Sequence, residues 1–262
     1  MSLRERLTAP LRPRQPKQPD SLFPLVRPLP LPDGVSEERL RAFLESVCVG
    51  DAPPEEMKSY CRSDFRRFVY TWGLLRDLQG RCLELGANPY FTTLLLERFT
   101  KLELTLANYF AEGAPPRCEQ EIAYVDFDSG ERRTERLAFH HFNIESGRFP
   151  FDDAMFDAVL FGEIYDPCSG YGPYGRHNRE YTRHDLAVLL GYLGFDLVDM
   201  FTADVHPNAA ATFCALDRLE PLVRFRKLDL GQYIFARAVS ARPAGPHRPS
   251  LLYRSYPPGE LE

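Results

Sequence analysis

Apolar residues near the start of the chain recur three or four positions apart, which is the spacing of one helix face. The first such stretch runs from Glu37 to about Val47, and Ser36 before it is a suitable N-cap because its hydroxyl can accept a backbone N–H. The second runs from Pro53-Pro54 to about Leu78, since proline is tolerated in the first turn of a helix. We predict two helices here.

After Gly80 the pattern changes to short apolar runs separated by turn residues, which is typical of alternating strands and helices. Strands are expected at 82–86, 102–107, 121–127, 133–142, 156–161, 195–201 and 232–239, and helices at 90–99, 182–193 and 208–219. Asp128-Ser129-Gly130-Glu131 is a strong hairpin signal. The first strand–helix–strand unit implies parallel strands with a right-handed crossover, so the sequence predicts an α/β fold.

Proline divides the chain. Residues 1–34 hold eight prolines, which exclude helix and central strand because proline lacks an N–H and has a fixed φ. We expect a Pro-rich N-terminal arm at 1–34, a helical appendage at 35–80, the α/β domain at 81–240 and a Pro-rich tail at 241–262.

Composition narrows the class of protein. Of the 262 residues 44% are hydrophobic and 26% charged, a globular balance, and the net charge of −5 gives no bulk attraction for nucleic acid. Since no apolar run approaches the roughly 18 residues of a membrane span, we expect a cytoplasmic protein. The six cysteines are irregularly spaced, which favours reduced thiols over zinc ligands or disulfides.

The candidate chemistry begins at Glu84-Leu85-Gly86-Ala87-Asn88, between an expected strand and helix. A glycine there lets a ligand approach the backbone, and a helix N-terminus offers free N–H groups. Because the full G-x-G-x-x-G pattern is absent, a nicotinamide enzyme is disfavoured. On this stretch alone, a plain strand-to-helix turn is the favoured interpretation.

Further motifs follow at the expected strand ends: Asn108-Tyr109, Asn143-Ile144-Glu145, Phe149-Pro150-Phe151-Asp152 and the run from Phe156 to Glu163. With the Glu84–Gly86 turn, this series resembles the class I S-adenosylmethionine (SAM) methyltransferases over about residues 81–239. The resemblance implies a Rossmann-like sheet with helices on both faces and SAM as the cofactor.

The resemblance also implies roles for single residues. Glu84 and Gly86 would border the methionine moiety, Asn88 replaces the second glycine of the first motif, and Asn108 takes the ribose position, which is usually acidic. Asn143 would lie near the adenine amino group, Ile144 would offer its backbone N–H, Glu145 is the acid that follows, and Glu163 would lie near the sulfonium.

The run from Tyr165 to Tyr181 is rich in tyrosine, glycine and arginine, as in similar methyltransferases encoded beside glycan-assembly enzymes. We expect Tyr171 and Tyr174 to stack on a sugar and Arg176 and Arg179 to bind phosphate, while His177 is the candidate proton acceptor. Such a loop would suit a small or glycan-linked acceptor in polysaccharide biosynthesis. The alternative is a loop closed by its own hydrogen bonds.

One segment of the family plan has no counterpart among the expected elements. Only about 18 residues separate Glu163 from the expected helix at Thr182, and none forms an apolar strand, so the fifth of seven strands is missing. We expect six of the seven strands of the family plan. Either the strands near 195–201 and 232–239 close against the strand at 156–161 to give a six-stranded sheet, or the sheet is split and the protein is poorly stable. The function expected from the resemblance is methyl transfer, impaired by this deletion. The alternative is an inactive methyltransferase-like binding or scaffold protein.

Overall fold

The computed structural model describes residues 28–50, 52–144, 148–162, 183–203, 205 and 233–245. Its helices are α3 (Glu37–Glu45), α4 (Pro54–Leu75), α5 (Phe91–Phe99) and α6 (Arg183–Tyr192). Its strands are β1 (Cys48–Val49), β2 (Gln79–Leu85), β3 (Lys101–Asn108), β4 (Arg117–Val125), β5 (Arg132–His141), β6 (Ala158–Phe161), β7 (Phe195–Ala203) and β8 (Tyr233–Ser240).

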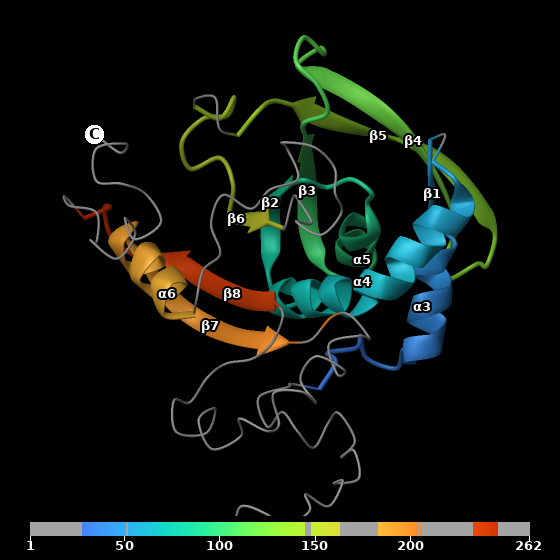
Figure 1. Cartoon of the computed structure of the whole chain (residues 1–262), viewed down its shortest axis with the longest axis horizontal. Coiled ribbons are helices and arrows are strands. Elements are labelled where there is room, and N and C mark those ends of the chain that lie inside the picture. Colours follow the sequence, from blue (N-terminus) through green and yellow to red (C-terminus); the bar gives the residue numbers. More distant parts are fainter. Residues whose placement is uncertain are drawn as a thin grey trace, which may run out of the picture.

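A six-stranded, mostly parallel sheet forms the centre of the molecule, in the order β1-β4-β5-β3-β2-β6 (Figure 1). Strands β5, β3, β2 and β6 run parallel, whereas β4 and β1 are antiparallel to their neighbours. The expected α/β class is therefore confirmed, and the sheet is compatible with a Rossmann-like fold. The central sheet has six strands without the last two strands of the chain, because β1 and the β4–β5 hairpin extend its other side.

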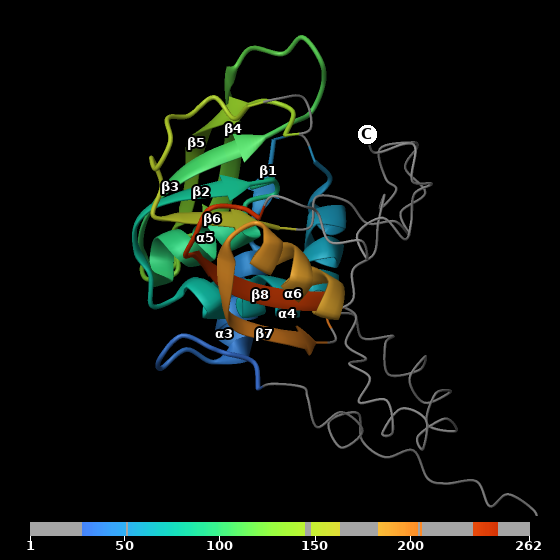
Figure 2. The same cartoon turned by 90° about the vertical axis from the view of Figure 1, so that its left-hand side faces the viewer.

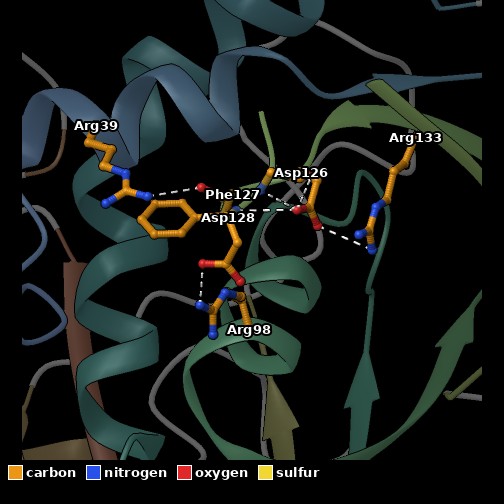
Figure 3. A network of polar contacts seen from close by, with 7 residues as sticks. Arg39, Arg98, Asp126, Phe127, Asp128 and Arg133 are labelled. Carbon is orange, nitrogen blue, oxygen red and sulfur yellow. Dashed lines mark hydrogen bonds and ion pairs between the residues drawn. The ribbon is translucent and has the colours of Figure 1, made fainter. Parts of the chain in front are cut away.

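The turn between β4 and β5 is the hairpin that the sequence predicted. Asp126 fixes it, since its Oδ1 accepts hydrogen bonds from the backbone N–H and the hydroxyl of Ser129, at 2.9 and 2.8 Å. Figure 3 shows how the turn is attached to the helices: the Phe127 ring lies under the Arg39 guanidinium at 4.2 Å, and Arg98 pairs with Asp128 at 2.6 Å. The hairpin is thereby fixed to both α3 and α5.

One face of the central sheet packs against the helices. Side chains of α3, α4 and α5 share a single buried core with β2, β3 and the hairpin, including Leu40, Phe65 and Leu95. The two N-terminal helices expected as an appendage are thus part of the main core. Helix α4 cannot stand apart from the domain, because its eight buried apolar side chains would then face water.

The opposite face of the sheet is covered differently from our expectation. Leu83, Leu85 and Ala107 pack there against aromatic and aliphatic side chains of the segment that follows β5: Phe142, Ile144, Phe149, Phe151 and Phe156. Within the described ranges no helix covers this face, so the expected helices on both faces are not found there. Large aromatic rings in an irregular segment do the same work of excluding water.

The last two strands do not join the central sheet. Strands β7 and β8 pair with each other as a separate antiparallel sheet, so the prediction that they close against β6 is wrong and the sheet is split (Figures 1 and 2). The pair docks instead on α4, where Phe201 and Phe235 lie 5.5 and 5.3 Å from the Tyr70 ring. This contact leaves Phe201 and Phe235 only 7% and 6% exposed.

Strand β6 is consequently the last strand of the central sheet, pairing with β2 alone among the described residues. Its apolar side chains Val159 and Phe161 are 56% and 63% exposed. The segment in which the fifth strand was sought, residues 163–182, and the helix expected at 208–219 lie outside the described residues.

Replacing Phe201 with alanine tests whether the aromatic contact holds the β7–β8 pair. Truncating a buried phenylalanine costs about 3–5 kcal/mol. We therefore expect faster amide hydrogen exchange in β7 and β8, with β2 and β3 still protected. Leu197→Ala, at an exposed position on the same strand, is the control and should change little. Equal loss of protection in both sheets would show that they unfold as one unit.

Candidate functional site

A cavity of about 160 Å³ lies at the carboxyl ends of the parallel strands β2 and β6. It is enclosed by the turn after β2, by one face of α4, by the end of β6 and by the start of β8. Ligands of open α/β sheets bind at the carboxyl ends of the strands, so this is the candidate binding site. The residues lining it that bear on its chemistry are Tyr60, Arg67, Glu84, Gly86, Asn88, Thr92 and Tyr233.

The turn after β2 is shaped by Gly86, whose φ of 71° lies in the left-handed region that favours glycine. The backbone N–H groups of Gly86 and Ala87 both donate to the carbonyl oxygen of Ala107, at 2.8 and 3.3 Å. The turn is therefore bonded to the end of β3. Those two N–H groups are satisfied by the protein itself.

A polar network holds the rest of the turn. The backbone N–H of Asn88 donates to Asn108 Oδ1 at 2.8 Å, and the Asn88 side-chain amide donates to Gln120 Oε1 at 2.9 Å. The Tyr90 hydroxyl donates to the same Gln120 oxygen and accepts from Asn108 Nδ2. These contacts also fix Tyr90 at its φ of 70°, an uncommon conformation for a tyrosine.

Asn108 lies where the sequence predicted, at the end of β3, but it is only 5% exposed. Both ends of its side-chain amide are bonded inside the network. In this arrangement Asn108 supports the turn, and its contact with a ribose stays a prediction.

Glu84 is the acid of the site and is 3% exposed. Its Oε2 accepts a hydrogen bond from the Thr93 hydroxyl at 2.8 Å. Burial raises the pKa of Glu84 to about 8; the Thr93 bond opposes this shift, and the charge of Glu97 adds to it. The carboxyl group is thus protonated at neutral pH and brings no negative charge to the cavity.

The wall contributed by α4 was missed by the sequence analysis. Tyr60, Arg67 and Phe68 lie on the side of α4 that faces the turn, and Arg67 donates to Asp64 Oδ1 at 2.8 Å and to the Tyr60 hydroxyl. Arg67 follows Tyr60 by seven residues, two helical turns, and so shares its face. The available signal was an Asp64–Arg67 pair, three residues apart and so on one face of the helix.

The structure brings three of the expected cofactor residues, Glu84, Gly86 and Asn88, to the cavity. Asn143 and Ile144 follow β5 along the same edge of the sheet, beyond Asn108, whose carbonyl accepts from the Phe142 N–H at 3.3 Å. Ile144 packs on the face opposite the helices. The other expected residues lie outside the described ranges: Glu145, Glu163, Tyr171, Tyr174, Arg176, His177 and Arg179.

Comparison with known proteins assigns this chain to no family. No protein-family model, no curated protein and no solved structure matches the chain. Among the described residues, no group of His, Cys, Asp and Glu side chains could hold a metal ion. In the same part of the chain, no helix combines the length and the apolar character that crossing a membrane would need.

The buried acid makes stability depend on pH. Between the ordinary Glu pKa of 4.5 and about 8, the unfolded chain is ionised at Glu84 while the folded protein keeps the proton. The folded state therefore binds more protons than the unfolded state, so the free energy of unfolding falls as pH rises through this window. Relative to Glu84→Gln, the wild type should lose on the order of a few kcal/mol between pH 4.5 and 8.

Urea unfolding of both proteins across this pH range measures the difference. Glu103→Gln, on an exposed position of the neighbouring β3, removes a carboxylate from solvent and serves as the control. A constant difference between wild type and Glu84→Gln would mean that Glu84 is ionised in the folded protein.

Proposed function

We propose that the cavity binds SAM and that the protein catalyses methyl transfer from it to a small or glycan-linked acceptor. The observation that carries the proposal is the position of Glu84, Gly86 and Asn88. These residues resemble the first methyltransferase motif, and they line one cavity at the carboxyl ends of parallel strands. The strand order around it, with β2 and β3 parallel and β6 on the other side, suits a nucleotide-type ligand.

The cavity fits part of the cofactor. Its volume of about 160 Å³ is below the roughly 300–1,000 Å³ of typical small-molecule sites, so it accommodates the amino-acid end. The nucleoside end extends along the strand ends toward Asn108 and the segment after β5. Phe110, 55% exposed beside Asn108, offers an apolar ring on that path.

The chemistry asks for little from the protein. Bound SAM supplies a methyl group already activated on a sulfonium. The remaining tasks of the chain are to hold the acceptor in line and to exclude water. The apolar and aromatic lining from Phe68, Leu160 and Phe235 serves the exclusion of water. His177 and the tyrosines and arginines of the 171–179 stretch remain the proposed acceptor side.

A second candidate is a methyltransferase-like protein that binds a ligand or partner without catalysis. It is favoured by the internal hydrogen bonds of the turn, since the Gly86, Ala87 and Asn88 N–H groups and the Asn108 amide already have protein partners. A ligand must exchange for these contacts or do without them, which lowers its affinity.

Calorimetric titration separates the candidates. We expect SAM and its demethylated product to bind and NAD not to bind, and we expect Thr92→Trp to abolish SAM binding because the indole would occupy the cavity that Thr92 lines. Thr134→Trp, at an exposed position on β5, should bind SAM as the wild type does. Melting temperatures of both variants show whether they fold.

The outcomes have distinct meanings. Absence of SAM binding by the wild type overturns the proposal, and unchanged binding by folded Thr92→Trp places SAM elsewhere. Binding without methyl transfer to any offered glycan or small acceptor selects the inactive candidate.

A further inference from the structure

Helix α4 brings one arginine to the cavity. Arg67 is the single Lys or Arg among the described residues that line it. Its side chain is 15% exposed, so the guanidinium is held largely out of solvent. An arginine remains charged when buried, and such a charge needs partners that bind it well.

The hydrogen bonds of Arg67 do not use all of its N–H groups. Its Nε donates to Asp64 Oδ1 at 2.8 Å, and its Nη2 donates to the Tyr60 hydroxyl. A guanidinium has five N–H groups, and these contacts use two of them. Within the described part of the chain, Arg67 Nη1 has no hydrogen-bond acceptor.

The guanidinium is also fixed in place. Its carbon lies 5.0 Å from the Phe68 ring centre and 5.8 Å from that of Tyr60, while Asp64, 4% exposed, is held by the Ser63 hydroxyl. A planar fork already oriented loses little entropy when it binds an anion. Because Asp64 balances its charge, the site suits a single carboxylate better than a doubly charged phosphate.

We propose that Arg67 selects the ligand by donating hydrogen bonds to a carboxylate, that of the amino-acid end of SAM and of its demethylated product. This inference rests on the proposed function, because it takes the cavity as the site of that end. Arg67 and the turn from Gly86 to Pro89 both line the cavity, so we place the carboxylate on the α4 side and the rest of the ligand toward the strand ends.

The test compares a ligand that has the amino-acid end with one that lacks it. S-Adenosylhomocysteine carries the carboxylate, whereas 5′-methylthioadenosine lacks the amino acid. Wild type should bind the former roughly 10- to 100-fold more tightly, the range that one charge-assisted contact gives. Arg67→Met should remove most of this ratio by weakening the first ligand alone. Arg67→Lys keeps the charge without the fork and should retain part of the ratio.

Two further variants control for the loss of charge and for misfolding. Arg62→Met removes an equal charge from α4 at an exposed position paired with Glu45, and should keep the wild-type ratio. Since Arg67→Met leaves Asp64 buried without its cation, the double variant Arg67→Met/Asp64→Asn is measured if the single one fails to fold. It should show the same loss of ratio.

Failure of the inference and failure of the proposed function look different. If the wild type binds neither nucleoside, the proposed function is wrong. If the wild type binds S-adenosylhomocysteine and the folded Arg67 variants keep its ratio to 5′-methylthioadenosine, the function stands and Arg67 is structural.

Discussion

Helix α4 has to bury two apolar surfaces at once, and the arrangement of the described helices and strands around it follows from this. Phe65, Phe68 and Trp72 pack into the core shared with α5 and the central sheet, whereas Tyr70 belongs to a second cluster with Phe201 and Phe235 of the β7–β8 pair. A 22-residue helix that is apolar on more than one side is stable only between two partners. The separate β7–β8 sheet therefore stabilises the fold, because it covers the apolar side of α4 that carries Tyr70.

The sequence predicted the local elements well, because their signals are local. Periodicity located α3, α4 and α5, and the Asp128–Glu131 turn located the hairpin. The sequence did not predict which elements pack together: the apolar residues at 195–201 indicate a strand but do not say that α4, not β6, will cover it. Asn108 shows the same limit in the site, since its place at a strand end was predictable and its commitment to Asn88 and Tyr90 was not. Arg67 was not predicted as a site residue, because only the fold shows that α4 and the turn after β2 line the same cavity.

The site joins two demands that compete. A turn that binds a ligand through its backbone needs free N–H groups, whereas a turn that stays folded around a tyrosine in the left-handed region needs them bonded. Here Ala107, Asn108 and Gln120 satisfy the turn from inside, and Glu84 is held by Thr93 in the same way. In the proposed site, recognition is thereby shifted from the turn to α4, where the guanidinium of Arg67 has further N–H donors.

The cavity is bounded on one side by β8 and on the others by α4 and the end of β2, so it exists only while the second sheet is docked. A ligand that fills it therefore binds the docked arrangement in preference to the undocked one. By thermodynamic linkage, each tightens the other: occupancy adds its binding free energy to the Tyr70 contact, and firmer docking raises affinity by the same factor. A molecule bound in the cavity would thus couple the two sheets of this protein.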